Sequence, residues 1–340
     1  MLGDPISSNG LSGARVLVTG ADGFIGSHLV ERLLAEGAKV RALCCYNSNG
    51  SRGWLDDVDD DGADGLETVL GDIRDAGLVR SLTDGIDIVF HLAALIAIPY
   101  SYQAPASFIE TNVTGTLNVL EAVRQSGVER MIQTSTSEVY GTPREVPITE
   151  THPLCGQSPY AASKIAADQL CEAYARSYST PVVILRPFNT YGPRQSARAV
   201  IPTIITQILS GRREINLGSL TPTRDFNYVE DTCRGMLALA GCKRAIGETV
   251  NIGSNFEISI GDMAGLIQEI LDTRVTIVTD AARVRPAQSE VERLCCDNAK
   301  IFALTGFRPQ VALKEGLTRT IAWLKRPENL ARSKAEIYNV

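Results

Sequence analysis

Short runs of apolar residues alternate with amphipathic stretches through the first half of the chain. The apolar runs predict β-strands, and apolar residues at helical spacing predict α-helices. Nearly continuous apolar strands separated by helices are typical of a parallel sheet covered on both faces, so the pattern predicts a doubly wound α/β fold. The expected strands are 15–19, 39–43, 67–71, 87–93, 130–135 and 181–186, and the expected helices are 24–36, 77–83, 104–126 and 159–178.

The second half predicts a smaller α/β lobe over the strand ends. We expect helices at 200–209, 260–271 and 313–323 and strands at 249–254 and 276–279. One segment, about 229–255, is predicted to return to the main sheet. The predicted division is a flexible N-terminal extension (1–13), a dinucleotide-binding domain (14–188 plus about 229–255), a substrate-binding lobe (189–228 plus about 256–325) and a C-terminal tail (326–340).

The composition excludes several classes of partner. The 340 residues carry a net charge of −6 and are 44% hydrophobic, which argues against binding to nucleic acid or an anionic membrane. No apolar run approaches the ~20 residues of a membrane span. The eight cysteines form no CxxC pair and the three histidines are scattered, so we expect no metal site and reduced thiols in the cytoplasm.

Three glycines follow the first predicted strand. Gly20, Gly23 and Gly26 stand at the turn into the first helix, in the segment TGADGFIG. Glycine lets the backbone approach a pyrophosphate, and the N–H groups of the first helical turn can hold the anion. This strand–turn–helix setting predicts a dinucleotide site.

A tyrosine and a lysine four residues apart indicate proton chemistry. Ser158 suits a helix cap and Pro159 a first turn, and the spacing puts Tyr160 and Lys164 on one helix face. A tyrosine is a poor base at neutral pH, and a nearby ammonium favours its phenolate. Such a pair on its own usually lies on the protein surface.

Hydroxyl residues crowd the end of the strand at 130–135. Thr136 there is placed to bond a substrate oxygen and share a proton with Tyr160, and Glu138 is a candidate acid/base. Alternatively, the hydroxyls satisfy loop backbone groups and Glu138 faces solvent.

Taken together, these segments resemble the extended short-chain dehydrogenase/reductase family. The matching pieces are TGADGFIG, GDIRD at 71–75, HLAA at 91–94, the Tyr160/Lys164 pair, RPFNTYGP at 186–193 and RDFNYVED at 224–231. The resemblance implies a Rossmann-type fold, a nicotinamide cofactor, a nucleotide-sugar substrate and a homodimer packed through the helices at 104–126 and 159–178.

The resemblance also implies roles for individual residues. Asp72 is expected at the adenine, and Asn189 and Arg224 near the substrate's diphosphate. The full cofactor set is Gly20, Gly23, Phe24, Ile25, Gly26, Asp72, Ile73, Leu92, Ala93, Ala94, Tyr160 and Lys164. The expected catalytic residues are Thr136, Glu138, Tyr160 and Lys164, and the expected substrate-binding residues are Ser137, Asn189, Arg194, Arg224 and Arg285.

Within the family, TSTSEVYG looks like the segment of nucleotide-sugar 4,6-dehydratases, especially GDP-mannose-type ones, and of UDP-glucuronate decarboxylases. The wider pattern, including RPAQSEVERL, looks most like dehydratases of UDP- or GDP-linked N-acetylglucosamine in legionaminic-type pathways. Many dTDP-glucose 4,6-dehydratases have an aspartate where this chain has Ser137. Either Glu138 serves both proton steps here, or a water bridged by Ser137 does.

Several alternatives stay open at this stage. A decarboxylase commonly carries an arginine just before the catalytic tyrosine, where this chain has Gln157, Ser158 and Pro159. A 4-epimerase usually lacks a carboxylate at position 138. A 5,6-dehydratase and a cofactor-sensing binding protein are further alternatives. NAD is the expected cofactor, although no carboxylate ends the second strand and Arg41 or Arg52 could accommodate the phosphate of NADP.

Overall fold

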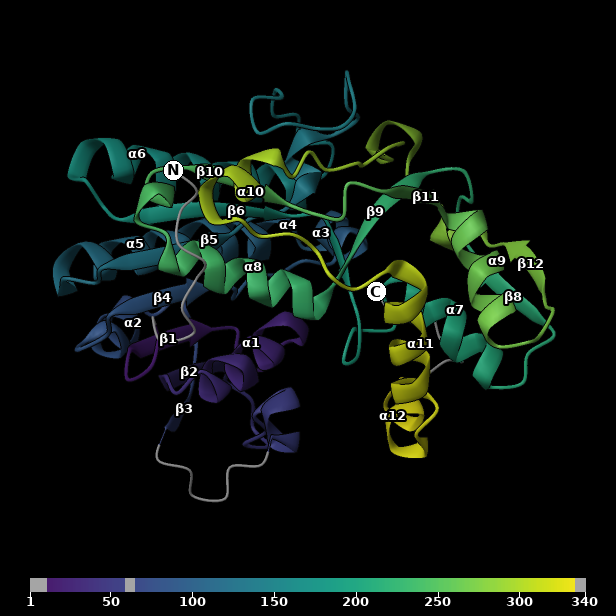
Figure 1. Cartoon of the computed structure of the whole chain (residues 1–340), viewed down its shortest axis with the longest axis horizontal. Coiled ribbons are helices and arrows are strands. Elements are labelled where there is room, and N and C mark those ends of the chain that lie inside the picture. Colours follow the sequence, from purple (N-terminus) through teal and green to yellow (C-terminus); the bar gives the residue numbers. More distant parts are fainter. Residues whose placement is uncertain (1–10, 59–64, 334–340) are drawn as a thin grey trace.

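The computed structural model describes residues 11–58 and 65–333 (Figure 1). Most of the predicted extension at 1–13 and the end of the predicted tail therefore lie outside the described residues. Leu11 is buried in the core, and the Gly13 N–H donates to the Gly37 carbonyl oxygen at 2.8 Å. The described end of the extension thus packs against the body of the protein.

Seven parallel strands form the central sheet, in the order β10-β6-β5-β4-β1-β2-β3. The chain runs outward from β1 to β3 and then crosses back to β4, so the order reverses between β1 and β4. Ligands of such sheets bind beyond the carboxyl ends of the strands at this reversal. The predicted Rossmann-type fold is confirmed. The strands are β1 Arg15–Thr19, β2 Lys39–Cys45, β3 Leu66–Gly71, β4 Ile88–His91, β5 Arg130–Thr134, β6 Val182–Pro187 and β10 Thr249–Ile252.

Both faces of the sheet are covered by helices, which explains why the central residues of its inner strands are apolar. Successive residues of a strand face opposite sides. Val16 and Val18 belong to the core under α1 and α8, whereas Leu17 belongs to the core under α2, α5 and α6, and all three are fully buried. The helices are α1 Phe24–Ala35, α2 Ala76–Thr83, α5 Gly115–Ser126, α6 Pro159–Tyr178 and α8 Val229–Gly241.

The prediction of one continuous helix at 104–126 is wrong in one respect. A π-helical turn, Ile109–Thr114, separates the short helix α4 (Pro105–Phe108) from α5. The buried Asn112 side chain lies in this turn, accepts from the Leu95 N–H at 2.8 Å and donates to the Leu95 carbonyl oxygen at 2.9 Å. These tertiary bonds accompany the wider turn, and such turns often stand at functional sites.

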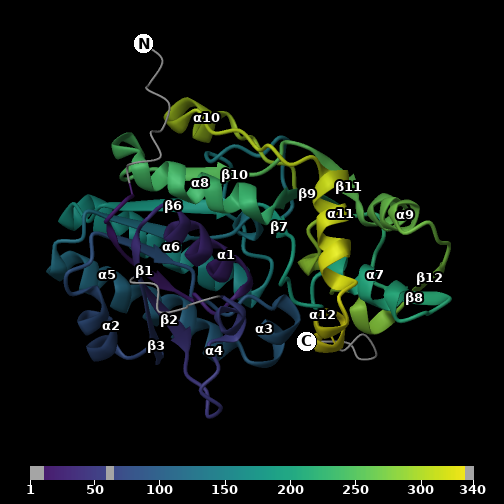
Figure 2. The same cartoon turned by 60° about the horizontal axis from the view of Figure 1, so that its bottom comes forward.

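The residues after β6 build a smaller part of the molecule, which lies on the right in Figures 1 and 2. A two-stranded sheet and a three-stranded sheet, ordered β11-β9-β7, support its helices. The chain returns to the main sheet through α8 and β10, which pairs with β6. The elements of this part are β7 Asn189–Tyr191, α7 Val200–Leu209, β8 Glu214–Leu217, β9 Thr223–Tyr228, β11 Glu257–Ser259, α9 Ile260–Ile270, β12 Thr276–Thr279, α11 Leu313–Leu324 and α12 Pro327–Arg332.

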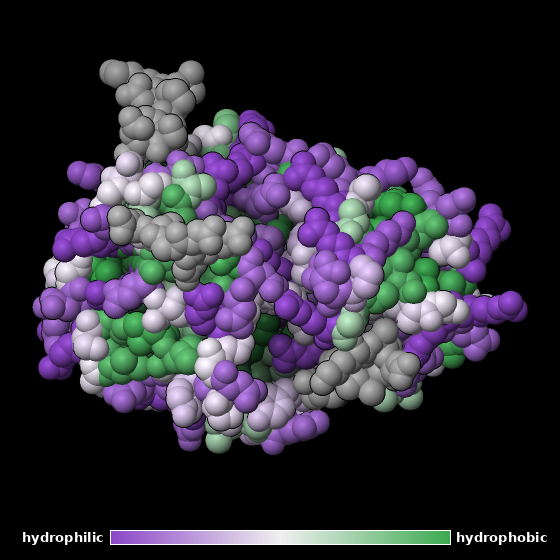
Figure 3. Space-filling model, turned by 90° about the horizontal axis from the view of Figure 1, so that it is seen from below, coloured by the Kyte–Doolittle hydropathy of each residue, from purple (hydrophilic) through white to green (hydrophobic). Residues whose placement is uncertain are grey.

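Hydrophobic residues reach the surface in separate patches among polar ones on the face drawn in Figure 3. Over residues 11–58 and 65–333, no helix combines the length and apolarity that crossing a membrane requires. Ile109 and Tyr178 are at least half exposed, and they lie next to or within the helices through which the homodimer is expected. The homodimer itself stays a prediction.

Candidate active site

The glycine turn after β1 leaves a cradle, a space beside the backbone at Gly20 and Gly26 that larger side chains would fill. Gly20 has a φ of +69°, and a Cβ there would lie 2.7 Å from the Ala93 backbone nitrogen. A Cβ on Gly26 would lie 2.1 Å from the Gly20 carbonyl oxygen. Gly23 precedes α1 and no side chain caps the helix, so backbone N–H groups of the first turn face the cradle. This geometry suits the diphosphate of a dinucleotide.

The loop after β4 closes one side of this cradle. The Leu92 N–H donates to the Thr19 carbonyl oxygen at 3.1 Å, and the Ala93 N–H donates to the Thr19 hydroxyl at 3.2 Å. The structure thereby brings together the predicted residues Gly20, Leu92 and Ala93. Their role in cofactor binding stays a prediction.

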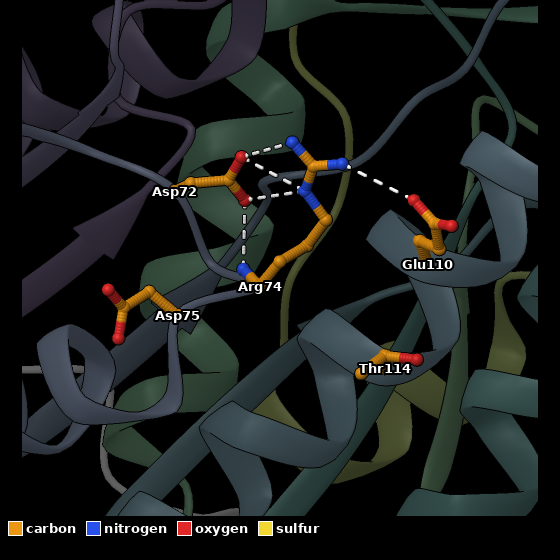
Figure 4. A pocket seen from close by; sticks show the side chains of 5 residues that line it. All are labelled: Asp72, Arg74, Asp75, Glu110 and Thr114. Atoms are coloured by element: carbon orange, nitrogen blue, oxygen red, sulfur yellow. Dashed lines mark hydrogen bonds and ion pairs between the residues drawn. The ribbon is translucent and has the colours of Figure 1, made fainter.

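Asp72, at the end of β3, lines an open cavity of about 560 Å³ (Figure 4). The Arg74 guanidinium lies between Asp72 and Glu110, at 2.6 Å and 3.4 Å from their carboxylate oxygens. The hydrogen bond from Arg74 holds the pKa of Asp72 below its usual value. Asp75 and Thr114 complete the lining. The expected adenine end of the site therefore presents a fixed, ionised carboxylate.

Thr136, Glu138 and Tyr160 meet at the end of β5. Thr136 is extended and its hydroxyl accepts from the Glu138 N–H at 3.2 Å, which begins the 3₁₀ turn Ser137–Tyr140. Ser158 caps α6 by accepting from the Ala161 N–H at 3.1 Å. Burial raises the pKa of Tyr160 well above its usual value and the Glu138 charge adds to this, whereas a hydrogen bond with Thr136 lowers it. The phenol is therefore protonated at neutral pH in the ligand-free protein.

Lys164 lies one turn after Tyr160 and is fully enclosed. Its ammonium donates to the Thr134 carbonyl oxygen at 2.7 Å, at the end of β5. Burial lowers the pKa of Lys164, and the Asp168 carboxylate, four residues further along α6, opposes that shift. Thus the lysine's charge depends on a buried counterion rather than on solvent.

Asp168 is a site residue that the sequence reasoning missed. It is completely buried, accepts from the Ser135 hydroxyl at 2.8 Å and pairs with the Arg186 guanidinium at 3.0 Å. Its other carboxylate oxygen, Oδ1, has no hydrogen-bond partner. The available signal was the spacing of four from Lys164, which places the carboxylate and the ammonium on one helix face.

We predict that Asp168→Asn lowers the free energy of unfolding by roughly 3–5 kcal/mol, because it leaves the buried Arg186 charge uncompensated. Urea denaturation measures the effect. Ser135→Ala is the matched control: it removes one hydrogen bond of the same carboxylate and is expected to cost about 1 kcal/mol. Equal losses for the two variants would contradict the role of charge.

Two arginines face Glu138 from the smaller part of the molecule. Arg285 lies 3.8 Å from a Glu138 oxygen and 3.6 Å from a Glu290 oxygen, and Arg224, on β9, lies 2.9 Å from the same Glu290 oxygen. Arg224 is largely buried, and desolvation lowers its pKa. The Glu290 carboxylate therefore interacts with two predicted substrate-binding residues, Arg224 and Arg285. Glu290 itself was not predicted from the sequence.

The remaining predicted substrate-binding residues lie in different surroundings. Ser137 is buried at the start of the 3₁₀ turn. Asn189 begins β7, and its buried side-chain oxygen has no hydrogen-bond partner. Arg194 instead forms a two-pronged ion pair with Glu31 of α1, at 2.7 Å and 2.8 Å. No contact joins Arg194 to Glu138 or Tyr160 in the part of the chain that the structure describes, and its role stays a prediction.

Known proteins share both the order of these motifs and the fold that carries them. The family described as GDP-mannose 4,6 dehydratase matches residues 17–320. The chain belongs to this family. It is 34% identical, over 92% of this chain and 98% of the relative, to a dTDP-glucose 4,6-dehydratase from Actinoplanes sp.. It is 33% identical, over 92% and 98%, to a UDP-glucose 4-epimerase from Mycolicibacterium smegmatis.

Among solved structures, DesIV, a dTDP-glucose 4,6-dehydratase from Streptomyces venezuelae with NAD bound, superposes with a TM-score of 0.85 at 35% identity, covering 94% of this chain and 99% of DesIV. The predicted membership of a short-chain dehydrogenase/reductase family of nucleotide-sugar dehydratases and epimerases is confirmed. The subtype that acts on N-acetylglucosamine stays a prediction, because family members with different reactions match about equally well.

Proposed function

We propose that this protein is an NAD-dependent nucleotide-sugar 4,6-dehydratase that converts UDP- or GDP-N-acetylglucosamine to a 4-keto-6-deoxy sugar. One observation carries the proposal: the Glu138 carboxylate stands beside the Tyr160 phenol at the end of β5, with Thr136 bonded to both residues. A reaction confined to C4 needs only the tyrosine, whereas elimination across C5 and C6 needs a second acid/base.

NAD fits the residues of the cradle. The backbone N–H groups after Gly23 would hold its diphosphate, Asp72 its adenine and Lys164 its nicotinamide ribose. When bound, NAD would supply the acceptor for the C4 hydride and the donor that reduces C6, so the reaction would have no net redox change. The NAD bound in DesIV, a relative at 35% identity, supports this cofactor.

Tyr160 begins the reaction by taking the proton of the sugar's C4 hydroxyl. Burial and the Glu138 charge raise the pKa of Tyr160, so its phenolate needs a cation. Lys164, one turn further along α6 and bonded to the Thr134 carbonyl oxygen, would supply that charge by turning towards the phenol. The resulting 4-ketone acidifies the C5 hydrogen, because the C5 carbanion delocalises onto the ketone oxygen. Thr136 and Tyr160 are placed to donate hydrogen bonds to that oxygen.

Glu138 then performs the elimination. Its carboxylate removes the C5 proton and returns it to the departing C6 hydroxyl, which leaves as water. When hydride returns to C6, C5 needs a proton again, and the proton that Tyr160 took from the C4 hydroxyl balances it. Ser137 stands where many dTDP-glucose dehydratases have an aspartate, so Glu138 carries both proton steps, alone or through a water that Ser137 binds. The Arg285 guanidinium lies 3.8 Å from one of the Glu138 carboxylate oxygens.

A UDP-glucuronate decarboxylase is the second candidate, and the charges around the site disfavour it. Such an enzyme must bind the substrate's carboxylate with a cation. Arg194 is paired with Glu31 and Arg224 with Glu290, and Arg285 lies 3.8 Å from Glu138 and 3.6 Å from Glu290. A uronate would have to displace one of these carboxylates, whereas the neutral C6 hydroxyl of N-acetylglucosamine would not.

Mass spectrometry of reaction mixtures tests the proposal. We expect the protein with NAD to convert UDP- or GDP-N-acetylglucosamine to a product lighter by one water. UDP-glucuronate and dTDP-glucose are the matched alternatives in the same panel. Loss of carbon dioxide from the glucuronate would support a decarboxylase. A new isomer of the same mass, separated by chromatography, would support a 4-epimerase, and no conversion with cofactor bound would support a cofactor-sensing protein.

A further inference from the structure

The end of β2 lacks the carboxylate that usually receives the adenosine ribose of NAD. In dinucleotide-binding sheets an acidic residue near this point accepts the ribose 2′-hydroxyl. Here β2 ends at Cys45, and the sequence from 39 to 55 contains no aspartate or glutamate. Asn47 follows, but its side chain is used within its own loop, where it bonds the backbone of Cys45 and Ser51.

Asp22 brings a carboxylate to this place from the glycine turn. Its Oδ2 accepts from the Cys45 N–H at 3.2 Å, at the last residue of β2. The backbone of Asp22 is held as well, since its carbonyl oxygen accepts from the Trp54 N–H at 3.1 Å. Gly53 passes so close that a Cβ there would lie 2.6 Å from the same oxygen. The carboxylate is thus fixed beside the strand end by the segment that follows it.

The cations of this region are already paired with carboxylates. Arg41 donates to Glu67 at 2.7 Å and to the Leu82 carbonyl oxygen at 2.9 Å, on the side of β3 and α2. Arg52 pairs with Asp56 at 3.3 Å. Arg41 and Arg52, which could accommodate a 2′-phosphate, are therefore each already paired with a carboxylate.

Asp22 is also partly buried. Burial raises the pKa of its carboxyl group, and burial together with the Asp22 charge raises the pKa of the Cys44 thiol to about 12. Because water screens this carboxylate incompletely, a second anion placed beside it is repelled strongly.

We propose that Asp22 selects NAD against NADP, by accepting a hydrogen bond from the ribose 2′-hydroxyl and repelling a 2′-phosphate at the same position. The inference rests on the proposed function for its nicotinamide cofactor, and it assigns cofactor choice to the glycine turn rather than to β2. The neutral 2′-hydroxyl of NAD gains the Asp22 carboxylate as a hydrogen-bond acceptor, whereas the 2′-phosphate of NADP is repelled by the same carboxylate.

Isothermal titration calorimetry of the whole protein with NAD and with NADP tests the inference. We expect NAD to bind more tightly than NADP to the unaltered protein. Asp22→Asn is expected to reduce the preference, measured as the ratio of the two Kd values, by about tenfold or more, because the repulsion is removed. Glu36→Gln is the matched control: it removes one negative charge at the far end of α1, the helix that begins after Asp22, and the ratio is expected to stay within about twofold.

Asp22→Ser guards against a folding defect of the first variant, and thermal unfolding of both variants shows whether they are folded. A folded variant that keeps the original ratio of Kd values would overturn the inference, as would an unaltered protein that prefers NADP. Either result would leave the proposed function standing if the substrate still loses water. A protein that binds neither cofactor would instead contradict the proposed function.

Discussion

Replacement of Glu138 by glutamine is expected to slow the release of water roughly 10³-fold, the size of effect typical of a lost acid/base group. The amide cannot remove the C5 proton. Oxidation at C4 should persist, because Tyr160 is unchanged and loses a neighbouring charge that raises its pKa. Mixing the variant with NAD and substrate should therefore produce the absorbance of reduced nicotinamide without dehydrated product.

Glu290→Gln is the matched control for this variant. It removes another carboxylate of the same cluster of charges. Glu290 pairs with Arg224 and lies 3.6 Å from Arg285, but it is not among the charges that shift the pKa of Tyr160. We expect a change in KM larger than that in kcat. Full turnover by Glu138→Gln, or a loss of cofactor reduction in that variant, would contradict the assigned role.

Much of the fold follows from local patterns, because its strands are buried on both faces. The strands at 15–19 and 276–279 and the helices at 159–178 and 200–209 begin and end where they were predicted. The π-helical turn at 109–114 could not be predicted, since it depends on bonds between Asn112 and Leu95 that only the folded chain brings together.

In the candidate site, too, features that depend on the local sequence were predictable, and contacts between distant segments were not. Thr136 and Glu138 were predictable at the edge where ligands bind, because both follow the carboxyl end of β5. Tyr160 stands in the first turn of α6 instead, so this rule does not place it beside them. The pairing of Asp168 with Arg186 was not predictable, since charged residues in a helix usually face solvent. Arg194, with a left-handed φ of +69°, turns towards Glu31, far away in sequence, and no spacing rule encodes that contact.

Replacement of Tyr160 by phenylalanine is expected to stop the reaction before Glu138 can act. Without the phenol oxygen the C4 hydroxyl keeps its proton, so neither reduced nicotinamide nor dehydrated product should form, and we expect a loss of roughly 10³-fold or more in turnover. The variant should remain folded, because the ring still packs on Phe108 with centroids 6.2 Å apart.

The pH dependence separates this role from a structural one. Since Tyr160 must lose its proton to act and its pKa is raised, kcat/KM should rise with pH on the alkaline side of neutrality. In Glu138→Gln, removal of the neighbouring negative charge should move the rise in cofactor reduction to lower pH. Tyr160→Phe should show no such rise. An alkaline limb of cofactor reduction that is the same in all three proteins, measured on the residual activity of Tyr160→Phe, would mean that another group is the base.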